Sequence, residues 1–98
     1  MTNVRTPPLS DVETAIKIYY SKIELHNEDV KELFPTVKSK ATITRLKKKA
    51  REIMAENNIL SYNAQAVNTQ AAFMAWGLDI KDLETRYNKL KKFELIKN

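Results

Sequence analysis

Cysteine is absent from this 98-residue chain, and glycine and histidine occur once each, as Gly77 and His26. Without cysteine there is no disulfide framework, no thiolate zinc site and no thiol nucleophile. A single histidine leaves no multi-histidine metal site and argues against a serine–histidine triad. We therefore expect a protein that is not an enzyme and that holds neither a metal nor another cofactor.

Long apolar runs are also lacking. No stretch approaches the roughly 20 apolar residues that cross a bilayer, so we expect a cytoplasmic protein. One glycine is too few for the tight hairpins that a sheet protein of this length would need. The composition therefore predicts an all-α fold of about five helices, with residues 1–9 as a disordered leader and 10–98 as a single domain.

Positive charge is concentrated in one segment, which the net charge of +5 does not reveal. From Thr36 to Arg51 there are seven lysines and arginines and no acidic residue, whereas Ser10 to Glu32 has six acidic residues and three lysines. A localised basic segment indicates contact with phosphate or, less often, with a membrane surface or an acidic protein. We expect no membrane contact, because the large aromatic residues typical of an interfacial helix are missing opposite the lysines.

Capping and helix-breaking residues divide the chain into five predicted helices, which cover about 11–26, 28–34, 39–57, 70–76 and 79–95. Ser10 and Glu13 match a capping box, and Pro35 and Gly77 are typical of helix ends. The first helix is expected to bury one stripe, formed by Val12, Ile16, Tyr19, Tyr20 and Ile23. For residues 59–68 the sequence leaves open a loop or a short extended wing.

The third predicted helix, which Ser39 caps, has two different faces. At about 100° per residue, counted from Thr42, its apolar residues form a stripe centred near 70°. This core stripe consists of Ile43, Leu46, Ala50, Ile53 and Met54. The opposite face, near 250°, combines small or hydroxylated residues with long cations, a composition typical of a helix in the major groove.

The segment from Asp29 to Phe34, a turn, and the segment from Ser39 to Lys48 together resemble the helix-turn-helix of small bacterial and prophage DNA-binding proteins. The resemblance covers about 20 residues, and the turn is one or two residues longer than is usual in that family. It implies that Ile43 and Leu46 are buried in a recognition helix. It also implies a role in transcription regulation, in recombination of the excisionase type, or at a packaging or replication site.

Both arguments predict sequence-specific binding of duplex DNA, without a small-molecule substrate. Thr44 and Arg45 are expected near base edges, and Lys40, Lys47, Lys48 and Lys49 mainly on phosphates. The full predicted DNA-binding set is Lys38, Ser39, Lys40, Ala41, Thr44, Arg45, Lys47, Lys48, Lys49 and Arg51. The alternative is an adaptor protein whose basic face binds an acidic partner.

Two features of the C-terminal part are interpreted as structural. Ala71 to Leu78 also resembles a helix-turn-helix, but the helix after it opens with Asp79 and Asp82, whose carboxylates would repel DNA phosphates. The last helix has an apolar seam at spacings of 3 and 4 residues, which packs either on the core or on a second subunit, so a homodimer is a candidate assembly. That seam consists of Ile80, Leu83, Tyr87 and Leu90.

Overall fold

The computed structural model describes residues 9–61 and 63–97, so most of the predicted leader, as well as Tyr62 and Asn98, lies outside the described residues. The described part is mostly helical, with one small sheet of two strands. In chain order the elements are α1 (Val12–Ser21), β1 (Glu24–Leu25), α2 (Asn27–Leu33), α3 (Lys40–Glu56), β2 (Val67–Asn68), α4 (Thr69–Ala75) and α5 (Ile80–Lys97).

Helix α1 begins one residue later than the predicted capping box and ends five residues before the predicted end. Asp11, not Ser10, caps the helix, because its carboxylate accepts the Thr14 backbone N–H at 2.6 Å. After Ser21 the chain becomes extended, and β1 pairs antiparallel with β2, with Leu25 opposite Val67. The prediction of a helix to His26 is therefore wrong, since a strand pairing with a distant segment replaces the last helical turns.

The end of α1 also changes which side chains are buried. Ala15 and Ile18 form its core contacts, and Val12, Ile16 and Tyr19 are partly buried against the same core. Tyr20 and Ile23, which were predicted to lie in the core, are exposed. The predicted stripe of α1 is thus rotated toward Ala15 and Ile18, and two large apolar side chains are left on the surface.

Local capping signals set the ends of α2 and α3. The Asp29 carboxylate accepts the His26 backbone N–H at 2.9 Å, so His26 stands at the beginning of α2 and not at the end of α1. Pro35 follows the last turn of α2, as expected. Ser39 caps α3 by accepting the Ala41 N–H at 3.1 Å, which confirms the predicted beginning of the basic helix.

The last two helices are joined by the only glycine. Asn68, not Thr69, caps α4, because its side chain accepts the Ala71 N–H at 2.9 Å. Gly77 has a φ of +71°, in the left-handed region that glycine adopts without a steric cost. The chain turns there, and Asp79 accepts the Lys81 N–H at the beginning of α5.

The core lies where α1, α2, α3 and α4 meet. Helix α3 packs mainly on α4 and β2, whereas α2 packs on α1 and β1. Trp76 is buried among these helices, and its indole N–H donates to the Leu46 carbonyl at 2.9 Å. Val37, in the connection between α2 and α3, is buried in the same cluster. The connection is thereby fixed to the core.

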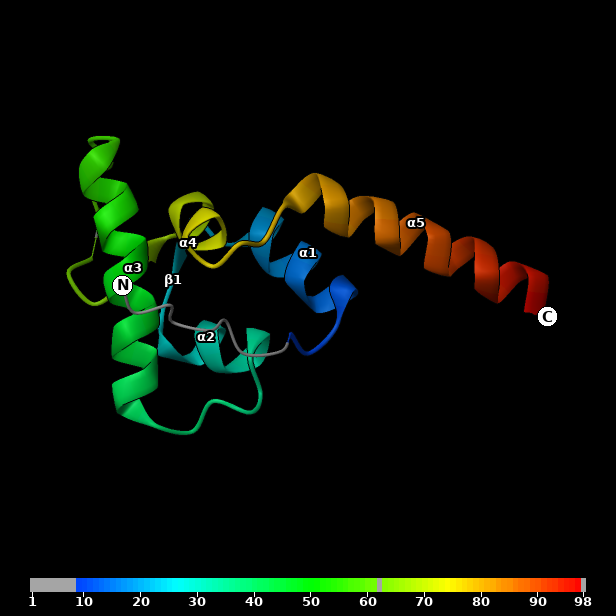
Figure 1. Ribbon diagram of the computed structural model, residues 1–98, viewed down its shortest axis with the longest axis horizontal. Coiled ribbons are helices and arrows are strands. Elements are labelled where there is room, and N and C mark those ends of the chain that lie inside the picture. The colour runs from blue at the N-terminus through cyan, green and yellow to red at the C-terminus, as the bar shows by residue number, and fades with distance from the viewer. Residues whose placement is uncertain (1–8, 62, 98) are drawn as a thin grey trace.

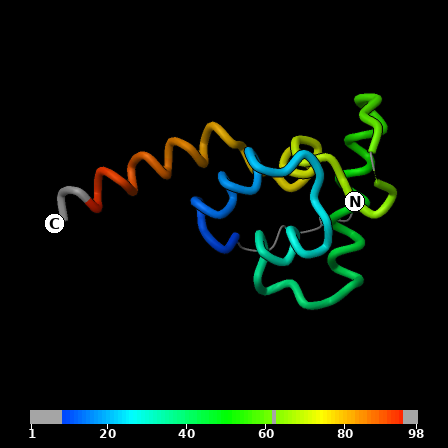
Figure 2. The backbone as a smooth tube through the Cα atoms, turned by 180° about the vertical axis from the view of Figure 1, so that it is seen from behind, coloured from blue at the N-terminus to red at the C-terminus, as the bar shows by residue number. Residues whose placement is uncertain are grey.

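Helices α3 and α5 lie at opposite ends of the molecule (Figure 1). Helix α5 packs on α1 at its beginning and then extends away from the other helices, which the view from behind also shows (Figure 2). Within the described residues no helix is long and apolar enough to cross a membrane. The basic helix is therefore at one end, and a long helix with a solvent-facing tail is at the other.

Candidate nucleic-acid interface

The core face of α3 is the one predicted from the sequence. Ile43, Leu46, Ala50 and Met54 are buried, and Ile53 is partly buried against them. Burial of these side chains fixes the rotation of the helix, so the residues on the opposite side must face solvent.

Most of the predicted contact residues are on that solvent side. Around the beginning of α3 and along its outer face the exposed members are Lys38, Ser39, Lys40, Ala41, Thr44, Arg45, Lys48 and Arg51. Lys49 is half-buried at the edge of the face. Among the described residues none of these cations forms an ion pair with a carboxylate. Apart from Arg51, whose guanidinium donates to the Ala64 carbonyl, they are therefore available to an anionic ligand.

Lys47 does not belong to this face, so the structure contradicts its prediction as an exposed phosphate contact. Only 7% of the residue is exposed, and its ammonium group donates a hydrogen bond to the Gln65 backbone carbonyl. It lies beside a hollow of about 380 Å³ that it lines together with His26, Asn27, Glu28 and Gln65. The wheel angle of Lys47, about 140°, is only about 70° from the centre of the core stripe, which is the sequence signal that places it near the core.

The surroundings of Lys47 disfavour its positive charge. Burial lowers its pKa, and the neighbouring positive charge of Arg51 lowers the pKa further. The group that accepts its hydrogen bond is a neutral carbonyl, which compensates a buried ammonium less than a carboxylate would. Burying the charge of Lys47 therefore lowers the free energy of unfolding. In return, the hydrogen bond from Lys47 fixes the position of the chain around Gln65.

Lys47 and Arg51, one helical turn apart, together hold the loop that follows α3. The Arg51 guanidinium donates to the Ala64 carbonyl at 3.0 Å, next to the carbonyl that Lys47 contacts. The exposed side chains of Asn63 and Gln65 are thereby kept beside the basic face. Neither residue belongs to the set predicted from the sequence, because neither is charged and their place depends on contacts across the fold.

The same loop is ordered by its own polar groups. The Asn63 side chain accepts the Gln65 N–H at 2.8 Å, and the Ser61 hydroxyl donates to the Glu24 carboxylate at 2.8 Å. Of the alternatives for residues 59–68, the described residues 59–61 and 63–68 show an irregular loop whose last two residues form β2. This segment pairs with β1, far away in the sequence, and not with a neighbouring strand of its own.

Helix α4 is part of the core, whereas the predicted dimer seam of α5 is used largely within the chain. Ala71, Ala72 and Phe73 of α4 are buried. In the predicted seam of α5, Leu83 is buried and Ile80 packs on the same core, so both are used within the chain. Only Leu90 of the seam is mainly solvent-exposed.

Neither a protein-family model, nor a curated protein, nor a solved structure matches this chain. Within residues 9–61 and 63–97 there is also no group of three or more His, Asp or Glu side chains placed to hold a metal ion.

Proposed function

We propose that the protein binds duplex DNA through the exposed basic face of α3. The observation that supports this most directly is the uniform sign of charge from Thr36 to Arg51, most of it on the solvent side of a helix whose other side is firmly packed. A packed helix with one cationic face offers phosphates a rigid set of charges, and phosphate contacts supply most of the free energy of non-specific DNA binding.

The exposed side chains divide by reach and chemistry. Ala41 and Thr44 are short, so they allow the helix backbone to approach base edges in the major groove. Arg45 lies beside them, and a guanidinium that bonds both guanine acceptors contributes about 1–3 kcal/mol of discrimination. The lysines at positions 38, 40, 48 and 49 contact phosphates and contribute affinity without sequence preference.

The loop held by Lys47 and Arg51 widens this surface. Asn63 and Gln65 present amide groups beside α3, and amides bond adenine edges or phosphate oxygens. Because the hydrogen bonds to Gln65 and Ala64 order the loop before binding, less conformational entropy is lost when DNA is contacted. We propose these two side chains as additional contacts in a regulator, a recombination accessory protein or a packaging protein of prophage type.

The decisive measurement is a titration of labelled random-sequence duplex at several salt concentrations. We expect affinity to fall with log salt, by about 0.9 log units per log unit of salt for each phosphate contacted. Unlabelled duplex should displace the labelled one. Absence of binding at low salt by a folded protein would contradict the proposal, and would instead favour an acidic protein as the partner of the basic face.

Arg45→Ala tests the assignment of base contacts. After selection of a preferred sequence, this variant should lose preference among duplexes more than it loses affinity for random duplex. Lys48→Ala is the matched control, because it removes one exposed charge of the same helix and should weaken all duplexes about equally. An equal loss for all sequences in both variants would show that Arg45 contacts phosphate only.

A further inference from the structure

The second half of α5 is a second basic segment of the chain. Residues 86–97 have five lysines and arginines and one acidic residue, Glu94. By contrast, residues 10–35 and 52–85 together have eleven of the twelve acidic residues and only four lysines. The two basic segments are therefore separated by acidic segments. We call residues 86–97 the α5 tail.

The fold places the two basic segments on opposite sides of the molecule. Helix α3 packs mainly on α4 and β2, so its basic face points away from both of them. Helix α4 lies between α3 and α5, and the α5 tail extends away from α3, as the two views of the chain show (Figure 1, Figure 2). A straight duplex on the basic face of α3 therefore does not reach the α5 tail.

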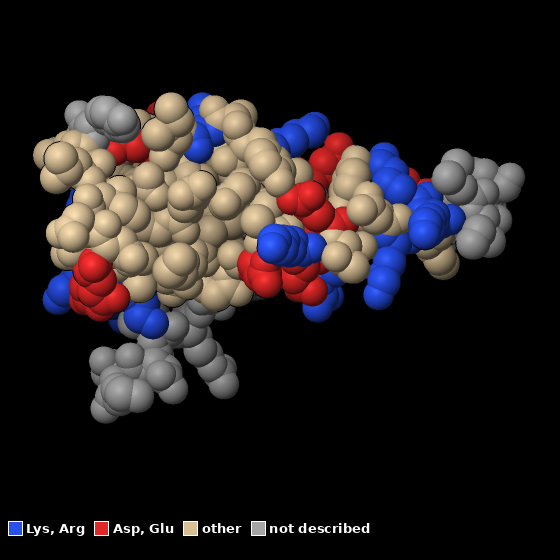
Figure 3. Space-filling view, turned by 90° about the horizontal axis from the view of Figure 1, so that it is seen from above, with Lys and Arg blue, Asp and Glu red and all other residues tan. Residues whose placement is uncertain are grey.

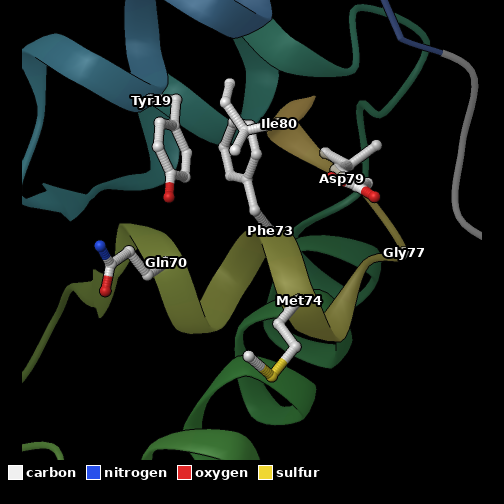
Figure 4. Close-up of a pocket in the computed structure, with 8 residues that line it drawn as sticks. Tyr19, Gln70, Phe73, Met74, Gly77, Asp79 and Ile80 are labelled. Atoms are coloured by element: carbon white, nitrogen blue, oxygen red, sulfur yellow. The ribbon is translucent and has the colours of Figure 1, made fainter. Parts of the chain in front are cut away.

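The surface between the two basic segments is neutral or acidic. Tyr19, Phe73 and Met74 line a hollow of about 570 Å³ between α4 and the beginning of α5 (Figure 4). Among the described residues, the lining of this hollow has no cation and one carboxylate, that of Asp79. Acidic side chains gather where α5 leaves the body, and basic side chains follow further along the helix (Figure 3). The α5 tail is thus a separate basic surface.

Two lysines of the α5 tail point directly to solvent. With Leu83 at 0°, Lys92 lies at about 180° and Lys89 at about −120° around α5. Leu83 is buried because α5 packs on α1 by this side, so the two lysines are on the opposite side, and both are exposed. Their spacing of three residues makes them neighbours on the helix surface.

The charges of these two lysines are not compensated by a carboxylate. Within residues 9–61 and 63–97, neither Lys89 nor Lys92 forms an ion pair. The nearby cations are already engaged, since Arg86 pairs with the Asp82 carboxylate at 3.0 Å and the Lys91 ammonium lies 5.3 Å from the centre of a tyrosine ring. Lys89 and Lys92 are therefore the cations of the α5 tail that are free for an anionic ligand.

The arrangement favours nucleic-acid phosphates over a membrane surface as that ligand. Leu90 and Phe93 are exposed and lie at about −20° and −80° around α5. Exposed Arg86 lies between them, at about −60°. An interfacial helix keeps its cations on the side opposite its apolar face, and α5 does not. Duplex DNA, the proposed ligand of α3, also has the phosphates that exposed lysines bind by releasing counterions.

We propose that one chain links two segments of duplex DNA, with α3 on one segment and Lys89 and Lys92 of the α5 tail on phosphates of the other. The contact of α3 is the proposed function, on which this inference rests, and the contact of the α5 tail is additional. Because only phosphates are contacted there, the second segment is held without sequence preference.

The experiment measures how many duplexes one chain holds. At low salt and with short random-sequence duplex in excess, analytical ultracentrifugation should detect one chain of 11.3 kDa together with two duplexes. In a capture assay, duplex fixed to beads should retain a labelled free duplex only when the protein is present.

Lys89→Gln with Lys92→Gln should still bind one duplex through α3 but should lose the second. Loss of two phosphate contacts lowers the magnitude of the salt slope for the second duplex by about 1.8. If this variant holds the second duplex as tightly as wild type at about 1 M salt, it holds it about sixtyfold more weakly at about 0.1 M. Lys22→Gln with Lys81→Gln is the matched control, because it removes two exposed lysines from the acidic segments and should still hold two duplexes.

The possible failures are distinguishable. A wild type that binds one duplex and never a second would overturn the link and leave the proposed function standing, whereas no binding at all would overturn both. A complex of two chains with two duplexes, unchanged in the Lys89 and Lys92 variant, would show that association of chains joins the DNA, against the proposal. If the α5 tail retained vesicles of phosphatidylserine and phosphatidylcholine but no second duplex, its partner would be a membrane and the proposal would be wrong.

Discussion

The contrast between Lys47 and Lys48 gives the sharpest prediction about the basic helix. Lys47→Met and Lys48→Met remove the same charge from adjacent positions of α3, so both lower the net charge of +5 by one. The long-range attraction of DNA is therefore changed about equally in the two variants. A difference between their salt slopes therefore reports direct contact with phosphate, because Lys48 is exposed and Lys47 is buried against the loop.

The expected magnitude follows from counterion release. Loss of one phosphate contact lowers the magnitude of the salt slope by about 0.9. A variant that binds as tightly as wild type at about 1 M salt then binds about eightfold more weakly than wild type at about 0.1 M salt. Lys48→Met should show this whole change. Lys47→Met should leave the slope as it is in wild type, and any loss of affinity should be the same at every salt concentration, because it comes from a less ordered loop.

Fluorescence anisotropy of a labelled duplex measures both slopes, and thermal melts of the two variants confirm that they are folded. Equal reductions of the slope would show that Lys47 leaves the Gln65 carbonyl and reaches phosphate when DNA binds. A wild-type slope in Lys48→Met would show that the exposed face of α3 is not the phosphate-contacting face. Either result would refute the assignment of these two lysines.

Three further predictions concern the fold. Leu46→Asp should abolish the cooperative melt followed by circular dichroism, because a carboxylate at a fully buried position costs more than about 4 kcal/mol, a large part of the stability of a small domain. Gly77→Ala should lower the free energy of unfolding by about 1–2 kcal/mol in a denaturant titration, because no atom obstructs a Cβ there and the cost comes from the positive φ alone. Since the folded-state pKa of Lys47 is lowered, the unfolded chain binds more protons between that pKa and about 10.4, so wild type should gain stability relative to Lys47→Met as the pH rises through this window.

The parts of the fold that follow from local chemistry could be predicted from the sequence. Ser39 begins α3 because its side chain satisfies a free N–H, and Gly77 ends the α4 segment because it adopts a positive φ. The burial of Leu46 follows from the period of the helix. None of these features requires knowledge of a distant residue, so the pattern of the neighbouring residues was enough.

The errors in the prediction have a common physical origin. The helical pattern of α1 continues through Ile23, but the backbone of Glu24 and Leu25 bonds instead to Val67 and Asn68, more than 40 residues away. A periodic sequence does not reveal such a competing partner. Ile23 lies beyond the end of α1, in the connection to β1, and Tyr20 lies beside the buried stripe of Ala15 and Ile18. Both are exposed and form apolar surface that local reasoning had assigned to the core.

Lys47 shows that a contact with a residue distant in the sequence also changes the candidate functional site. Seven cations counted along the sequence would give a salt slope of about −6 if each contacted one phosphate. The structure removes Lys47 from that count and engages Arg51 with the Ala64 carbonyl, which leaves five cations and a slope of about −4.5. In place of two phosphate contacts, Lys47 and Arg51 make the hydrogen bonds that hold Asn63 and Gln65 beside α3. Two cations that would have strengthened DNA binding without sequence preference therefore position amides that can contribute to selecting a sequence.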